Sequence, residues 1–345
     1  MFKNLPLTFG LSIVGLMLLI AIFGPSLAPH DPVEEHRAFR YEGQLYGGPP
    51  MAALPPFSHP EYPLGFDDIS RDLLSRLLWA VRPTLVLCTI IAAVRLLLGL
   101  VVGGVVGFLG PRVASWLDTI TTITSSLPIL IVALGYLIWT GGSAVIVYQG
   151  VRPITANNAG LTAFIVALCM TGWVNSASVV QGYVQKILHA PYLESAQAIG
   201  LNRWQITRRY ILPQVWPLLP MLLASELTAV TLIVAELGYL GYYIGGSYIY
   251  TDKTTDSPLP DIVKQKAGQP ELGQMLSDFF GQYSRAPWVS IFAGLLMVLL
   301  LVGFTLTSEG LRRSLDITRP RRWSWRNLLP RKTSKTSKSK LNQAA

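Results

Sequence analysis

Three ionisable residues stand inside long apolar stretches of the sequence, where a charge is costly. Arg95 lies near the middle of one stretch, and Glu226 and Glu236 lie in another. A charge at the centre of a membrane span costs about 3 kcal/mol on insertion scales, so such residues face a bundle interior or a wet cavity and have partners. Two interpretations follow. One is an ion pair between Arg95 and a glutamate that ties two spans together, which we favour. The other is a cavity charge that meets the carboxylate of a transported solute.

The remaining reactive residue types form no catalytic or metal-binding pattern. The four histidines are scattered without an H-E-x-x-H spacing, and Cys88 and Cys169 lie in apolar runs without a C-x-x-C spacing. The sequence has no G-x-x-x-x-G-K-[ST] loop to hold phosphates, and no nucleophile–base pair stands in the apolar stretches. The sequence therefore predicts that the chain is not an enzyme and holds no metal or cofactor of its own.

The composition indicates a membrane protein with several spans. Of the 345 residues, 51% are hydrophobic and only 14% are charged, yet the formal net charge is +9. A soluble domain of this length needs many more charges to cover its surface. From residue 312 to the end there are eleven Lys or Arg residues and one acid, which places the basic excess beside the last apolar stretch. This arrangement favours membrane topology and contact with anionic lipid over binding of nucleic acid.

Six apolar segments are long enough to cross about 30 Å of hydrocarbon. They are Leu7–Ala28, Thr84–Leu109, Thr119–Trp139, Leu161–Val180, Trp216–Leu237 and Trp288–Leu306. The distribution of Lys and Arg along the chain predicts that both termini are cytoplasmic. Pro128 predicts a bend in the third segment, and that bend would serve gating or plain packing.

These segments divide the chain into four parts. Residues 1–28 form a retained N-terminal anchor helix, 29–83 an extracytoplasmic segment, 84–311 the main body of spans, and 312–345 a basic cytoplasmic tail. The main body carries a cytoplasmic loop at 186–213 and an external loop at 242–287. Within the second part, the alternation of apolar and charged residues predicts an amphipathic helix over Asp67–Ala80 that lies flat on the outer surface.

The loop at 186–213 has strong local signals. Pro191 suits the first turn of a short helix, and Gly200 suits the left-handed residue just past its end. Asn202 is placed to cap a second amphipathic turn. Pro213 is expected to prevent that turn from running straight into the next span. A compact, polar, helical loop at a membrane surface is typical of a site that another protein binds.

This loop resembles the one that bacterial ABC importer permeases insert into their ATPase subunits. Glu194, Ala196, Gly200, Leu212 and Pro213 match its Glu-Ala-Ala, Gly and Leu-Pro positions, with Ser195 in place of the second alanine. Three further stretches resemble the C-type subunit of oligopeptide and dipeptide importers: Leu64–Leu78, Glu236–Gly241 and Pro270–Trp288. The sequence departs from that branch after Trp173, where Asn175, Ser176, Ser178 and Gln181 stand in place of the usual arginines.

The resemblance implies an all-α membrane protein of six transmembrane helices, with the type I ABC importer permease fold and a cytoplasmic coupling helix. It implies a bacterial cytoplasmic membrane protein that transports oligopeptides or dipeptides. Its partners would be a second homologous permease, two ATPase subunits that bind ATP and Mg, and an extracytoplasmic solute-binding protein. In the loop, Glu194 would accept a charge-assisted hydrogen bond from a partner Arg or Lys. The small residues Ser195, Ala196, Ala198 and Gly200 would allow close backbone approach.

Two alternatives stay open. The same scaffold serves nickel or another small solute within the family. A different class is a secondary transporter or channel, which would carry inverted repeats. No such symmetry is seen in the sequence, so this class is disfavoured.

Overall fold

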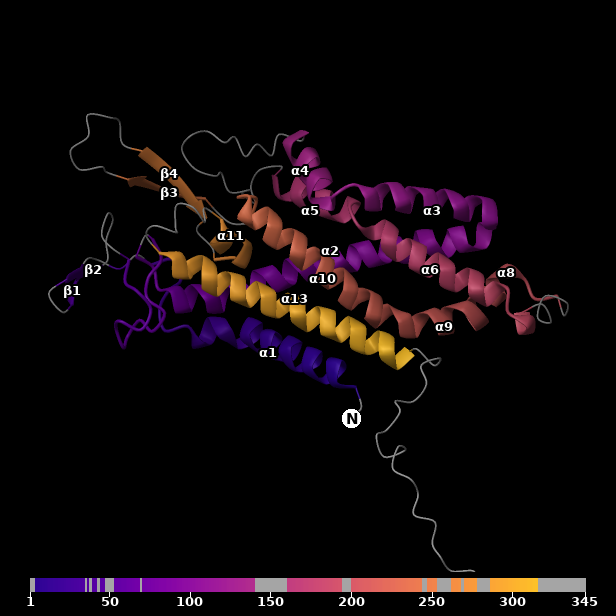
Figure 1. Cartoon of the computed structure of the whole chain (residues 1–345), viewed down its shortest axis with the longest axis horizontal. Helices are drawn as coiled ribbons and strands as arrows, with labels where there is room; N and C mark the ends of the chain where they lie inside the picture. Colours follow the sequence, from indigo (N-terminus) through magenta and orange to yellow (C-terminus); the bar gives the residue numbers. More distant parts are fainter. Residues whose placement is uncertain are drawn as a thin grey trace, which may run out of the picture.

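The computed structural model describes residues 4–34, 36, 39–41, 44–46, 53–68, 70–139, 160–193, 200–243, 247–252, 262–267, 270–277 and 286–315. Long helices lie side by side along one axis and form a single bundle (Figure 1). The helices are α1 (Leu5–Leu27), α2 (Leu73–Leu109), α3 (Pro111–Ser126), α4 (Ile129–Trp139), α5 (Gly160–Met170), α6 (Trp173–Leu188), α8 (Arg203–Ile206), α9 (Leu212–Val215), α10 (Leu219–Tyr239), α11 (Leu272–Leu276) and α13 (Pro287–Leu315).

Within the described residues, five helical stretches are long and apolar enough to cross a membrane. They are Leu5–Leu27, Leu73–Leu109, Phe164–Leu188, Trp204–Tyr239 and Pro287–Leu315. A sixth arises if the bent pair α3 and α4 counts as one span. Each of the six apolar segments predicted from the sequence therefore has a helical counterpart.

The bend predicted at Pro128 is confirmed. The axes of α3 and α4 meet at 83° across this residue. Leu127 adopts an extended backbone, with φ −99° and ψ 130°. The ring of a proline disfavours helical geometry in the residue before it, so the helix ends there and restarts in a new direction.

The amphipathic surface helix predicted over Asp67–Ala80 is wrong. The helix begins at Leu73, where Asp72 accepts hydrogen bonds from two backbone N–H groups of the first turn, and it continues without interruption to Leu109. The charged residues expected on a solvent face are buried instead, with Arg71 at 2% and Arg76 at 1% exposure. They lie in a polar network with residues distant in sequence, and periodicity alone does not reveal such partners.

Small residues let the main helices approach closely. A side chain at Gly103 of α2 would clash with the carbonyl oxygen of Ala177 in α6. A side chain at Gly310 of α13 would meet the backbone nitrogen of Leu7 in α1 at 2.5 Å. Helices in lipid associate through such close backbone packing, because apolar burial gives little advantage there.

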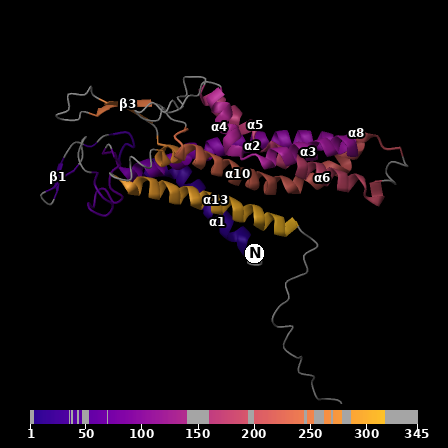
Figure 2. The ribbon, with the colours of Figure 1, turned by 45° about the horizontal axis from the view of Figure 1, so that its top comes forward.

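In the described part of the chain, two short antiparallel hairpins lie outside the bundle, and the sequence did not predict them. Strand β1 (Phe39–Tyr41) pairs with β2 (Gln44–Tyr46), and β3 (Ser247–Asp252) pairs with β4 (Ile262–Ala267). Both hairpins lie at one end of the molecule, and α8 lies at the other (Figures 1 and 2). The start of α1 and the end of α13 point toward the end that carries α8. The bundle itself is helical, as predicted.

Candidate functional site

The base of the loop at 186–213 is held by aromatic and apolar contacts. Leu193 is fully buried among apolar side chains of α6, α8 and α9. The ring of Tyr192 stacks on that of Tyr210 with centroids 6.2 Å apart, and its phenolic oxygen accepts a hydrogen bond of 3.1 Å from the Gln214 amide. The loop therefore leaves the bundle from a fixed base. Four of its predicted docking residues lie outside the described residues, namely Glu194, Ser195, Ala196 and Ala198.

The return side of the loop has the local geometry that the sequence predicts. Gly200 has a φ of +88°, in the left-handed region that glycine tolerates. The Asn202 side-chain oxygen accepts a bond of 2.9 Å from the Gln205 backbone N–H. The Gln205 side-chain oxygen accepts one of 3.0 Å from the Asn202 N–H. This reciprocal pair is a capping box, which confirms Asn202 as the start of the second helical turn.

The expectation that Pro213 separates this turn from the next span is wrong. From Trp204 to Tyr239 the chain is one helical stretch. It passes through a π-helical turn, η1 (Thr207–Ile211), and a 3-10 turn, η2 (Trp216–Leu218). In η1 the Leu212 N–H bonds to the Thr207 carbonyl, and this wider turn accommodates a proline that has no N–H to donate. Gly200, Leu212 and Pro213 all lie at the surface.

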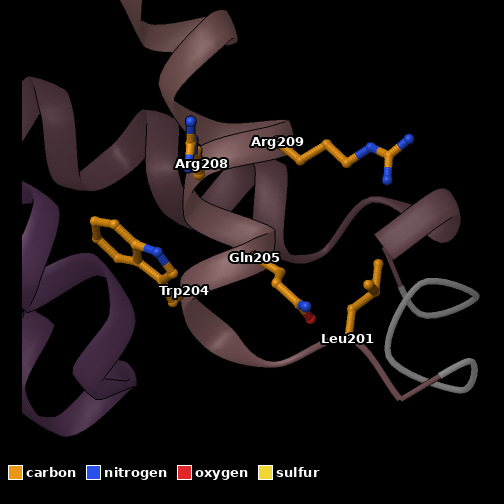
Figure 3. Close-up of a pocket in the computed structure, with 5 residues that line it drawn as sticks. All are labelled: Leu201, Trp204, Gln205, Arg208 and Arg209. Atoms are coloured by element: carbon orange, nitrogen blue, oxygen red, sulfur yellow. The ribbon is translucent and has the colours of Figure 1, made fainter.

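An open hollow of about 370 Å³ lies beside the capping box. It is lined by Leu201, Trp204, Gln205, Arg208 and Arg209, with Trp204 and Arg209 projecting to opposite sides of the helix (Figure 3). The Trp204 side chain is 71% exposed. Sequence reasoning missed these residues as a group. The exposed tryptophan beside paired arginines on a capped turn was the available signal.

Arg95 is completely buried, and two of its three nitrogens have fixed partners. Its Nε donates a hydrogen bond of 2.5 Å to the carbonyl of Leu168, and Nη2 donates one of 2.7 Å to the hydroxyl of Thr171. A side chain at Gly172 would lie 2.8 Å from Nη1, so only glycine leaves room for the guanidinium there. The break between α5 and α6 therefore holds the Arg95 guanidinium in place.

The predicted tie between spans joins Arg95 with Glu226. Arg95 Nη1 lies 3.8 Å from Glu226 Oε2, and the hydroxyl of Ser176 donates a hydrogen bond to Glu226 Oε1. Glu236, the other candidate, lies outside this ion pair. A cavity of about 190 Å³ adjoins the pair and is lined by side chains of α2, α4, α6 and α10. The structure thus brings two of the three predicted mid-span charges together.

A second buried ionic network lies between the start of α2 and the end of the bundle that carries the hairpins. Asp67 receives hydrogen bonds from the backbone N–H of Arg71 at 2.9 Å and from its Nε at 2.7 Å. Arg76 Nε lies 3.5 Å from the same carboxylate, and its other nitrogens donate to the carbonyl of Pro32 and the side chain of Gln274. This network fixes the segment before α2 against the segment before α13.

Histidine and aromatic rings pack above that network. His36 stacks on Phe66 with centroids 5.2 Å apart, and lies 5.3 Å from the ring of His30. Burial lowers the pKa of His36 from its ordinary value of 6.5, and the neighbouring His30 lowers it further. The nearby carboxylates of Glu34, Asp72 and Glu61 oppose this shift. Burial also raises the pKa of Tyr62 in the same cluster.

Acidification is therefore expected to destabilise this end of the molecule. Well above pH 6.5 the folded and unfolded chains both keep His36 neutral. As the pH falls through that value the unfolded chain binds the proton first, so stability decreases. His36→Phe is expected to flatten the decrease of Tm between about pH 7.5 and 5. His189→Phe, at an exposed site, is the matched control and should keep the original slope. An unchanged slope in the His36 variant would contradict the assignment.

Among the described residues, no three His, Cys, Asp or Glu side chains gather closely enough to hold a metal ion.

Two family models of transport permeases match the chain. Residues 96–316 match the family described as binding-protein-dependent transport system inner membrane component. Residues 1–49 match the N-terminal transmembrane domain of oligopeptide transport permease C.

Individual relatives cover most of the chain. A dipeptide transport system permease protein of Bacillus subtilis is 26% identical over 316 residues, which are 91% of this chain and 82% of the relative. An oligopeptide transport system permease protein of the same organism is 26% identical over 89% of this chain and 84% of the relative. A probable D,D-dipeptide transport system permease protein of Escherichia coli is 27% identical over 92% of this chain and 89% of the relative.

Among solved structures, an inward-facing form of the MetNI methionine ABC transporter aligns with 70% of this chain and 96% of its own. The identity is 21% and the TM-score 0.45. The family match spans more than half of the sequence and includes the 186–213 loop and Glu226, and it begins one residue after Arg95. The chain therefore belongs to the inner membrane components of binding-protein-dependent transport systems, as an ABC importer permease.

Proposed function

We propose that this chain is one of two permease subunits of an ATP-driven importer that carries oligopeptides or dipeptides across a bacterial cytoplasmic membrane. The observation that carries this proposal is the alignment of dipeptide and oligopeptide permeases along about nine-tenths of the chain. A second homologous permease completes the route, and a solute-binding protein delivers the peptide from outside. Two ATPase subunits bind ATP and Mg, so this chain holds no cofactor.

The two ends of the bundle suggest an orientation. The loop at 186–213, the start of α1 and the end of α13 share one end (Figures 1 and 2). That end carries Lys186, Arg208, Arg209, Arg312 and Arg313. Basic residues concentrate on the cytoplasmic side of membrane proteins. We therefore place this end, with both termini and the tail 312–345, in the cytoplasm. Residues 29–83 and 242–287 then face outward.

The loop at 186–213 is the proposed contact with an ATPase subunit. Its base is fixed by Tyr192 and Leu193, and its return side continues as helix through to Tyr239. A push on the return side of the loop is then transmitted to α10 along this helical stretch. Surface residues Gly200, Leu212 and Pro213, with the hollow around Trp204, offer the ATPase a shaped contact.

Substitutions in the loop are expected to uncouple transport. Gly200→Leu forces a left-handed backbone on a side chain that disfavours it by about 1–2 kcal/mol, which distorts the loop. Glu194→Lys reverses the charge proposed to meet a partner Arg or Lys. Either change should lower ATP-dependent peptide uptake by roughly tenfold or more, the first through the distorted loop and the second through loss of a charge-assisted bond. The measurement is uptake of labelled trialanine into proteoliposomes that contain the complete importer.

The matched control is Gly182→Leu, at an exposed glycine of α6 where an added Cβ atom meets no atom within 4 Å. This variant should insert, assemble and transport. Co-purification of the ATPase subunits with each variant reports assembly. Normal uptake by both Gly200→Leu and Glu194→Lys would contradict the proposed role of the loop in coupling to the ATPase. Absence of peptide uptake by the unchanged importer would contradict the proposal that its substrates are peptides.

A further inference from the structure

The Arg95–Glu226 pair is held apart, and each partner has a spare polar atom. Two Arg95 nitrogens are bonded to the α5–α6 break, and the third, Nη1, is buried with no hydrogen-bond partner among the described residues. One Glu226 oxygen is bonded to Ser176. The remaining oxygen lies 3.8 Å from Nη1, beyond the length of a hydrogen bond. Each side chain is anchored by its other contacts, so the gap is a built feature of the site.

The spare donor and the spare acceptor adjoin the same cavity of about 190 Å³. A buried guanidinium nitrogen left without a partner costs free energy, and a ligand that bonds to it recovers that cost. The cavity is large enough for a short peptide segment rather than for one water molecule alone. Its polar lining comes from three separate helices: Arg95 of α2, Asn175 and Ser176 of α6, and Ser225 and Glu226 of α10.

The mouth of the cavity does not face lipid. Asn175 and Ser225 line the cavity and are exposed. Other exposed positions on the helices of the bundle carry apolar side chains. Leu97 of α2 is 59% exposed and Leu295 of α13 is 62% exposed, as is typical of lipid-facing positions. Polar groups inside a membrane face the bundle interior or a water-filled cavity. The mouth therefore opens to a wet route or to the partner permease that lines it.

The charges of the pair select the ligand. Arg95 and Glu226 together are neutral, and a free carboxylate near Nη1 would also meet the Glu226 carboxylate at close range. A main-chain amide carries both a carbonyl acceptor and an N–H donor and has no net charge. Given the proposed peptide importer, we propose that the Arg95–Glu226 cavity binds the main chain of the peptide in transit. Arg95 Nη1 donates to a peptide carbonyl, and Glu226 Oε2 accepts from a peptide N–H. Because both hydrogen bonds go to the main chain, the cavity does not select peptides by their side chains.

Occupancy can be measured directly at the mouth. Asn175→Cys is introduced with Cys88→Ala and Cys169→Ala in the full permease–ATPase complex in detergent. The rate of thiol modification by a methanethiosulfonate reagent is then compared with and without trialanine. The peptide is added directly, so its binding does not depend on the solute-binding protein. Trialanine is expected to slow modification of Cys at 175 by about tenfold or more. Thr89→Cys, exposed in a separate groove between α1 and α2, is the control site and should show no protection.

Two changes test the two hydrogen bonds. Trialanine methylated on its peptide nitrogens has no amide N–H to donate to Glu226 and should protect about tenfold less well. Glu226→Gln should weaken protection by unmodified trialanine to a similar extent. The modified peptide needs no further substitution, so it decides the question even if the Gln variant is unstable. Equal protection by both peptides, protection by sodium acetate at the same concentration, or no protection would each overturn the proposal. Absence of trialanine uptake by the unchanged importer would instead overturn the proposed function, and this inference with it.

Discussion

Asp67→Ala is expected to be the most destabilising single substitution in the described part of the chain, at about 5 kcal/mol. The Asp67 carboxylate faces two guanidinium groups, those of Arg71 and Arg76, and all three residues are no more than 2% exposed. Removing one member of a buried ion pair leaves an uncompensated charge, which costs more than the pair contributed. Here a single change removes the carboxylate that two guanidinium groups share. The segment before α2 is expected to detach and α2 to lose its capped start.

The measurement is thermal unfolding of the purified chain in detergent, followed by exposure of the buried thiol of Cys88. The matched control is Glu309→Ala. Glu309 also pairs with two arginines, Arg312 and Arg313, but their side chains are 63% and 39% exposed. Exposed pairs contribute about 0–1 kcal/mol, so this variant should unfold almost as the unchanged chain does. Equal destabilisation by the two variants would show that burial does not determine how much stability is lost when the shared carboxylate is removed.

Arg95→Met is the second large effect, expected at about 3–5 kcal/mol. The substitution leaves Glu226 inside the bundle with Ser176 as its hydrogen-bond donor and no cation. It also removes the donors to the Leu168 carbonyl and the Thr171 hydroxyl, which loosens the break between α5 and α6. Unfolding in detergent reports the loss, and the double variant Arg95→Met with Glu226→Gln should recover most of it because no buried charge remains.

Exchange of the two charges is not expected to rescue stability. A glutamate at position 95 would place a carboxylate against the Leu168 carbonyl, where two acceptors repel. The pair is therefore directional, and its polarity is set by the backbone around it. Full stability of the exchanged variant Arg95→Glu with Glu226→Arg would contradict the claim that the backbone around position 95 requires a donor there.

Local signals in the sequence predicted the parts of the structure that local chemistry decides. Gly200, the Asn202 cap and the bend at Pro128 each depend on residues within one turn, and each is confirmed. The choice between Glu226 and Glu236 was beyond the sequence. Ten residues apart on one helix, they are separated by about 15 Å along the axis and point in different directions. Only the packing of α10 against α2 and α6 decides which one meets Arg95.

The misread surface helix has a similar cause. The spacing of apolar and charged residues over Asp67–Ala80 is the same whether the charges face water or face buried partners. Those partners, Pro32 and Gln274, lie 44 and 198 residues from Arg76. Long-range hydrogen bonds of this kind leave no trace in a short window of sequence. The π-turn before Pro213 was missed for a different reason, because helix rules allow only for i→i+4 bonding.

The contact between α1 and α13 has a consequence for how the chain is made. The Asn4 amide donates a hydrogen bond of 2.6 Å to the carbonyl of Gly310, across 306 residues of sequence. At about 5–20 residues per second, a ribosome takes roughly 15–60 s to synthesise the chain between these two residues. The first span must therefore wait in the bilayer without its final neighbour. Its 23 residues contain no charge, so the helix is stable in the bilayer until the last span arrives to pack against it.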